Sequence, residues 1–168
     1  MGTFTSIPRE AIKGVGGIDY VLIANYADVS TSIDTTTGLV TMNPSTNAAW
    51  KKFVPRKESS NFTETMTGTP ATGISSFAQV LTLVFAYNQT TKRNQLKIMS
   101  QSEVKAVVMD RNGTGWLMGS RNGMDLTSGT LTTGAANRDM TGMTVVLSAN
   151  ESEPIAEVPA GIITAITP

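Results

Sequence analysis

The fold is decided by the stretch Ser76-Phe-Ala-Gln-Val-Leu-Thr-Leu-Val-Phe-Ala-Tyr87. Successive side chains of a β-strand point to opposite faces, so this stretch places apolar residues on both of its faces. One face carries Phe77, Leu81, Leu83, Phe85 and Tyr87, and the other carries Ala78, Val80, Val84 and Ala86. Strands that are apolar on both faces are typical of the middle of a sheet with packing on each side. We therefore expect a central strand that is covered on both faces.

The residues that flank this strand predict a second strand and a helix. In residues 61–67 the side chains of Phe62, Glu64 and Met66 alternate with three Thr side chains. This period of two predicts a strand that packs through one face and turns its hydroxyl face toward water or a neighbouring subunit. Residues 91–102 predict a short amphipathic helix that lies on the sheet, with Thr90 or Thr91 as its N-terminal cap.

Other short runs rich in Thr, Val and Ile end at Gly, Asn or Pro, which is typical of strands in an antiparallel fold. They lie at residues 20–24, 38–42, 49–54, 104–110, 114–119, 124–127 and 139–148, and the apolar residues of 154–168 would add one more. The Asn-Gly pairs at 112–113 and 122–123 favour tight hairpin turns, and 130–138 is expected to be a connection. The sequence thus predicts a mainly β fold, an antiparallel β-sandwich or barrel of about eight strands with one flanking helix near 91–102.

A chain of 168 residues is expected to form a single domain over 1–168, because no linker divides it. Residues 1–17 are expected to be a flexible N-terminal segment. Residues 30–60 are polar and weakly patterned, and they predict a long hairpin arm or loop. Its aromatic residues either pack under the sheet or reach a neighbouring copy, in which case Trp50 and Phe53 are the candidate inter-subunit contacts.

The residue types present argue against catalysis. The chain has no His and no Cys, and 13 Asp and Glu residues balance 13 Lys and Arg residues. Imidazoles, thiolates and tuned carboxylates supply most acid–base and nucleophilic groups, so we expect a protein that is not an enzyme, without catalytic, cofactor-binding or metal-binding residues. Zero net charge argues against general nucleic-acid binding. No apolar stretch approaches the roughly 20 residues of a membrane helix, and residues 1–17 lack the apolar core of an export signal.

Three local motifs favour ordinary local structure over binding sites: a flexible segment for the first and turns for the other two. The stretch Lys13-Gly-Val-Gly-Gly17 lacks the strand, the helix and the Gly-Lys-Ser/Thr ending of a phosphate loop. The stretch Asp110-Arg-Asn-Gly113 lacks the later acidic ligands of a calcium loop and predicts a hairpin turn. Glu151 and Glu153 are expected to lie in a solvated turn before Pro154.

Three stretches of sequence carry a resemblance to a known class of protein. In residues 116–129 a strand ends in Gly119 and an Asn-Gly turn follows. In residues 134–147 the stretch Asp139-Met-Thr-Gly142 leads into an apolar strand. The third stretch is Glu151-Ser-Glu-Pro-Ile-Ala156. These stretches resemble small virion proteins of tailed bacteriophages. The layout strand, strand, helix, strand over residues 62–110 is similar to that of the major tail tube protein family, and the resemblance covers about two-thirds of the chain.

The resemblance implies a structural role in the virion tail. Subunits of that family form homo-oligomeric, hexameric rings whose sheets join around a lumen, and stacked rings form the conduit for DNA ejection. The implied partners are further copies, other tail or connector proteins, and DNA that passes without sequence-specific binding, with no cofactor and no membrane. The implied location is the virion, after synthesis and assembly in the host cytoplasm.

Other functions are compatible with the same β-rich sequence. A head–tail connector, a tail terminator ring and a capsid decoration protein are alternatives within the virion. A carbohydrate-binding β-sandwich is a more distant alternative, because such a domain uses exposed aromatic residues and the chain has only two Trp and three Tyr.

Overall fold

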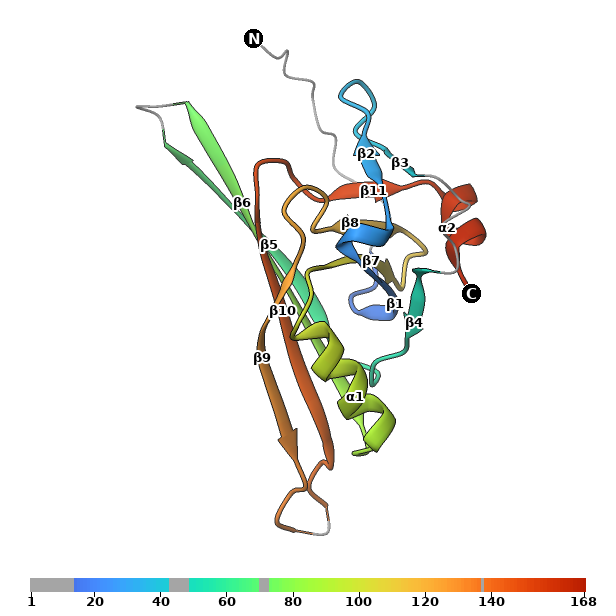
Figure 1. The fold of residues 1–168 in the computed structure, drawn as a ribbon, viewed down its shortest axis with the longest axis vertical. Coiled ribbons are helices and arrows are strands. Elements are labelled where there is room, and N and C mark those ends of the chain that lie inside the picture. Colours follow the sequence, from blue (N-terminus) through green and yellow to red (C-terminus); the bar gives the residue numbers. More distant parts are fainter. Residues whose placement is uncertain (1–13, 43–48, 70–72, 137) are drawn as a thin grey trace.

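The computed structural model describes residues 14–42, 49–69, 73–136 and 138–168. Two antiparallel sheets face each other, and a small hairpin and two helices flank them (Figure 1). The expected fold class, a mainly β structure of antiparallel sheets consistent with a β-sandwich, is confirmed. The described residues form eleven strands, which is more than the sequence predicted. The segment 1–13, part of the N-terminal segment expected to be flexible, lies outside the described residues.

The first sheet has five strands in the order β11-β8-β7-β1-β4. Their bounds are β1 Ile18–Asn25, β4 Lys51–Phe53, β7 Val104–Asp110, β8 Gly115–Met118 and β11 Ala156–Val158. The middle strand, β7, is buried from Val104 to Met109 because both of its faces are covered. One face packs against the second sheet, and the other packs against the hairpin of β2 (Thr31–Ile33) and β3 (Val40–Met42) and against the helix α2 (Ala160–Ile166).

The second sheet has four strands in the order β5-β6-β10-β9. Their bounds are β5 Asn61–Thr69, β6 Ile74–Ala86, β9 Asp125–Thr132 and β10 Gly142–Glu151. The strand β6 lies between β5 and β10, so its predicted central position is confirmed. Its inward face is covered, and Leu81 and Leu83 are fully buried; on the other face Val84 is buried, but Ala78 and Val80 in the middle of the strand are partly exposed. The expectation that both faces are covered is therefore wrong for the single subunit.

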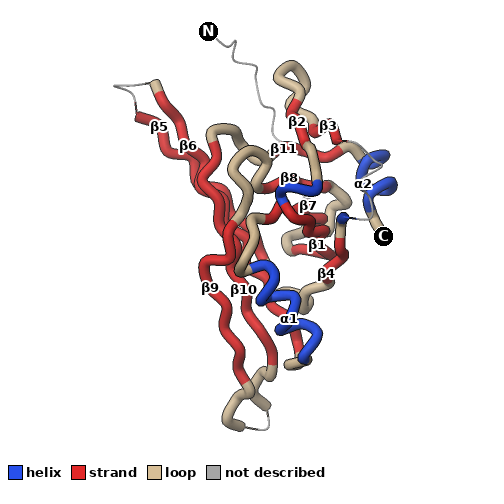
Figure 2. The backbone as a smooth tube through the Cα atoms, viewed as in Figure 1, coloured by secondary structure: helices blue, strands red, loops and turns tan. Residues whose placement is uncertain are grey.

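The main core lies between the two sheets. It is built from inward residues of β1, β7 and β8 on one side and of β6 and β10 on the other. The helix α1 (Thr90–Met99) lies at one side of the two sheets (Figure 2). Its Leu96 and Met99 pack against this core, as its amphipathic pattern predicts. Its N-terminus differs from the expectation, because the cap residue is Gln89 and no side chain makes the capping hydrogen bond.

Residues 30–60 do not form one long arm in their described parts. The short β2–β3 hairpin packs on the five-stranded sheet through Val40 and Met42, and β4 joins that sheet as an edge strand. The hairpin that projects from the body is instead β5–β6, which is exposed at residues 67–69 and 74–76 near its end (Figure 1). Segment 43–48 of the predicted arm lies outside the described residues.

The C-terminal part of the chain also differs from the expectation. The sequence predicts one strand within 154–168, but the structure has the short strand β11 followed by α2. The side chains of Ile163 and Ile166 are three residues apart, lie on one side of α2 and are buried. The strand β9 likewise extends to Thr132, into residues expected to form a connection.

A substitution in β10 tests how closely the strands of the second sheet pack. Replacing Gly142 by Ala would drive the new Cβ into the carbonyl oxygen of Phe85 on the neighbouring strand. We expect Gly142→Ala to lower the free energy of unfolding by about 1–3 kcal/mol, the usual cost of overpacking. Urea unfolding measures the change. Gly68→Ala is the matched control, because a Cβ at Gly68 meets open space, and an equal cost for both variants would contradict this packing.

Candidate assembly surface

The outward face of the four-stranded sheet is a broad surface without charge over β5, β6 and β10. Because paired residues of antiparallel strands share a face, the register assigns Thr63, Val80 and Ser148 to one row of it. The outward residues of these three strands are Asn61, Thr63, Thr65, Thr67, Thr69, Ile74, Ser76, Ala78, Val80, Thr82, Val84, Ala86, Gly142, Thr144, Val146, Ser148 and Asn150. The predicted hydroxyl face of residues 61–67 is thus confirmed as exposed. On β6 the outward side chains are mostly apolar, and Thr144 and Ser148 on β10 carry hydroxyl groups again.

The two edge strands of this sheet expose unpaired backbone. Within the described residues, β5 pairs only with β6, and β9 pairs only with β10. All three ladders are antiparallel, so β5 and β9 run in opposite directions at the two edges. A second copy placed edge to edge can therefore continue the antiparallel order without a change of direction. Exposed edges of this length are a template for pairing with another chain.

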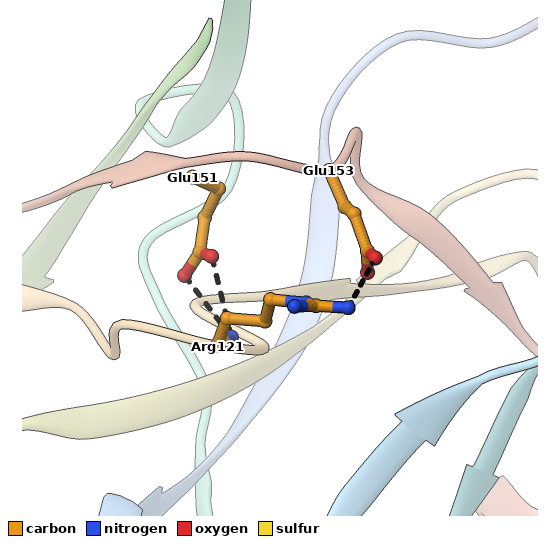
Figure 3. A network of polar contacts seen from close by, with 3 residues as sticks. All are labelled: Arg121, Glu151 and Glu153. Atoms are coloured by element: carbon orange, nitrogen blue, oxygen red, sulfur yellow. Dashed lines mark hydrogen bonds and ion pairs between the residues drawn. The ribbon is translucent and has the colours of Figure 1, made fainter.

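The two sheets are joined by polar contacts at the end of the core nearest the β10–β11 connection (Figure 3). The carboxylate of Glu151, which is 2% exposed, accepts hydrogen bonds from the backbone N–H groups of Arg121 and Asn122 at 3.0–3.3 Å. The guanidinium of Arg121 donates to Glu153 at 2.6 Å. Glu151 is thus a buried residue that holds the β8–β9 loop against β10, and the expectation of a solvated turn is wrong for it.

A second pair of polar side chains extends this contact along the inward face. The Gln79 side chain is buried on β6; its oxygen accepts from the backbone N–H of Gly119 at 3.0 Å, and its nitrogen lies 3.4 Å from Glu64 Oε1. Glu64 Oε1 also accepts the backbone N–H of Ile155 at 2.7 Å. The bond to Gly119 satisfies a buried donor that would otherwise destabilise the fold, and together these bonds fix the connections between the sheets.

The ammonium group of Lys105 ties a surface loop to the middle of the first sheet. Lys105 Nζ donates to the carbonyl of Val29 at 2.9 Å and to Thr31 Oγ1 at 3.0 Å, and it lies 4.4 Å from the ring centre of Tyr26. Burial lowers the pKa of Lys105, and the negative charge of Glu151 acts in the opposite direction. These contacts give Lys105 a structural role, because they hold the start of β2 in place.

The structure places the two candidate contact residues in different environments. Trp50 is fully buried beside Leu22, Met42 and the C-terminal helix, so the interpretation that it packs within the subunit is the one the structure supports. A contact with a neighbouring copy would require Trp50 to leave this core. Phe53 is partly exposed and its ring centre lies 6.2 Å from that of Phe85, beside an apolar pocket of about 260 Å³ between β4 and α1. Its role as an inter-subunit contact stays a prediction.

The predicted hairpin turn at residues 110–113 is present. Asp110 accepts hydrogen bonds from the backbone N–H groups of Asn112 and Thr114, and Gly113 has a φ of 85°. Burial acts to raise the pKa of Asp110, but these bonds, together with one from the Trp116 indole, outweigh it and leave the pKa lowered. Among the described residues, no cluster of three metal-ligating side chains is found. None of the helices in the described ranges is long and apolar enough to cross a membrane.

Comparisons with known proteins give one structural match. The sequence matches no protein-family model and no curated protein. A chain in the solved virion of a native gene transfer agent particle aligns with 80% of this chain and 98% of its own length, with 9% sequence identity and a TM-score of 0.42.

The buried carboxylate makes stability depend on pH. Burial raises the pKa of Glu151 above its ordinary value of 4.5, and the negative charge of Glu153 adds to this, although the two backbone hydrogen bonds act against it. The folded protein then binds the proton more tightly than the unfolded chain, so this contribution to stability is full below pH 4.5 and is lost as the pH rises through the folded pKa. We expect Glu151→Gln to remove that slope in urea unfolding between pH 4.5 and 7.

Asp139→Asn is the control for this measurement. The backbone N–H groups of Ala136 and Ala135 lower the pKa of Asp139 below 3.8, so its contribution to stability is lost only as the pH falls below that value. The slope above pH 4.5 should therefore persist in Asp139→Asn. A slope that also persists in Glu151→Gln would show that another group causes it.

Replacing Trp50 by Ala distinguishes a role in packing within the subunit from a role in contact between copies. Because the ring is fully buried within the subunit, we expect Trp50→Ala to lower the free energy of unfolding by about 3–5 kcal/mol. Urea unfolding at a low and a high protein concentration measures it. A loss of assembly without a loss of subunit stability would instead support the inter-subunit role of Trp50.

Proposed function

We propose that this chain is a structural protein of a tailed-bacteriophage virion, and that it is the major tail tube protein. In this proposal the subunit acts without catalysis. Copies associate into hexameric rings, the rings stack, and the resulting tube conducts DNA during ejection. The observation that carries the proposal is the four-stranded sheet, which has one outward face, two free edges of opposite direction and no charge on that face along β5, β6 and β10.

The free edges support assembly through backbone pairing. A closed ring of copies would pair every exposed edge of the four-stranded sheet and leave none open, which is how barrels avoid uncontrolled edge-to-edge association. A head-to-tail contact that closes also fixes the number of copies. The stagger of the sheet suits closure, because β5 pairs with the part of β6 between Ile74 and Thr82, whereas β9 lies level with Val80 to Ala86.

The composition of the outward face supports a wet channel for DNA. Its Thr, Ser and Asn side chains can hold water, and the outward positions of β5, β6 and β10 include no Lys or Arg that would bind phosphates. A lining of this kind lets the DNA backbone pass without strong attachment. The partners in this proposal are further copies of the chain and other tail or connector proteins, and the location is the virion tail after assembly in the host cytoplasm.

Electron microscopy of the purified protein over a concentration series tests the proposal. Tubes of uniform diameter with an axial repeat are expected at high concentration, because ring contacts add up cooperatively. Single rings that never stack would favour a connector or terminator ring, and binding to preformed capsids would favour a decoration protein. Monomers at every concentration would contradict the proposal, and glycan binding by such monomers would favour the carbohydrate-binding alternative.

A further inference from the structure

We infer that β5 of one copy pairs with β9 of the next copy in one register, with Phe62 opposite Leu131. This inference rests on the proposed function, since it specifies the joint between neighbouring subunits in a ring. The other sheet offers poorer edges: β4 and β11 have three residues each, and β11 is also bridged to Leu39. The edges β5 and β9 have nine and eight residues.

Exposed apolar side chains mark both edges on the same face of the sheet. On β5, Met66 is 68% exposed and is paired with the inward residue Phe77. On β9, Leu131 is 49% exposed and is paired with the inward residue Met143. Both therefore belong to the inward face, where edge-to-edge pairing of two copies would bring the β5 and β9 side chains together.

The main core reaches both edges and can continue across the joint. Phe62 on β5 and Leu126 on β9 are partly buried and pack against the core between the sheets. Joining the edges would cover Phe62 with Leu131 and Met66 with Leu126, so that one apolar seam runs from each subunit to the next. A β-bulge at Thr127 sets this spacing, because Ser128 and Leu126 pair with the consecutive residues Val146 and Leu147.

The register with Phe62 opposite Leu131 spans the whole of β9 and, compared with the two nearest registers that keep the faces aligned, matches the side chains on both faces. With Phe62 opposite Leu131, Glu64 lies opposite Gly129, which leaves space for the carboxylate. On the outward face Thr63 then lies opposite Thr130 and Thr65 opposite Ser128, and hydroxyl pairs of this kind stabilise cross-strand contacts. The register spans all of β9 and leaves the end of the β5–β6 hairpin beyond the joint.

A shift by two residues is the smallest that keeps the inward side chains of both strands on the inward face, and it removes these matches. In one direction Leu131 would lie opposite the charged Glu64, and Met66 would lie opposite Gly129. In the other direction Phe62 would lie opposite Gly129, and Leu131 would have no partner on β5. Both shifts leave an exposed apolar side chain without an apolar neighbour.

Engineered cysteine pairs test the register, and the chain is suited to this because it has no Cys of its own. The variant Thr63→Cys with Thr130→Cys places both thiols in register, as does Glu64→Cys with Gly129→Cys. Consecutive pairs in an antiparallel ladder alternate between hydrogen-bonded and non-hydrogen-bonded geometry, so one of the two variants has the closer spacing. A disulfide within one chain is excluded, because three strand spacings of about 4.8 Å separate the two edges.

The matched control is Thr65→Cys with Thr130→Cys, which has the same residue types and face but is shifted by two residues. After oxidation of assembled protein, we expect a ladder of cross-linked species for an in-register variant and loss of that ladder for the control. The largest closed species reports the number of copies in a ring.

The outcomes separate the joint from the proposed function. Assembled protein that cross-links through 65 and 130, or through none of these pairs, would overturn the register and leave the tube proposal standing. Protein that does not assemble at any concentration would overturn both. Unmodified protein, examined by electron microscopy in parallel, shows which of these applies.

Discussion

The backbone ladder between β6 and β10 is the constraint on which the rest of the structure depends. Every residue of β10, from Gly142 to Glu151, pairs with β6, and the two strands carry the inward side chains of the main core. The ladder also positions β5 and β9, because each of these edge strands pairs only with its neighbour in the described residues. The close approach at Gly142 and the edges offered to a second copy both follow from it.

The polar contacts at one end of the core explain why the two sheets keep a fixed relation. The carboxylate of Glu151 and the side chain of Gln79 both bind backbone N–H groups of the β8–β9 loop. Burying these groups costs free energy, which the hydrogen bonds offset. The result is a subunit in which one sheet is covered on both faces and the other is covered on one. The uncovered face is therefore a property of the fold, and the proposed tube makes use of it.

The sequence predicted the strands and the main helix well, because period-two alternation and the turn at 112–113 are local signals. The second Asn-Gly pair, at 122–123, was wrongly predicted as a hairpin turn, because β8 and β9 lie in different sheets. The sequence predicted residues 104–110 as a strand with the bounds that the structure gives to β7. It did not predict which sheet is covered on both faces. Val80 and Val107 have the same side chain, and their burial depends on elements far away in the chain. The helix α2 was missed, although Ile163 and Ile166 have helical spacing, because seven residues give a weak periodic signal.

The candidate surface was only partly predictable. The alternation of Thr63 and Thr65 with Phe62 and Met66 indicated an exposed hydroxyl face on β5. Which side chains of β6 and β10 share that face depends on strand register, which the sequence does not encode locally. The burial of Trp50 and of Glu151 likewise depends on contacts between segments far apart in the chain.

Hydrogen–deuterium exchange of dispersed and assembled protein tests most directly whether the four-stranded sheet continues between copies. We expect assembly to slow amide exchange in 61–67 and 125–132, because the backbone N–H groups that point away from the sheet at its two edges would gain hydrogen bonds. Exchange in β4 and β11 should change less. Assembly that protects other segments and leaves exchange in β5 and β9 unchanged would contradict the account.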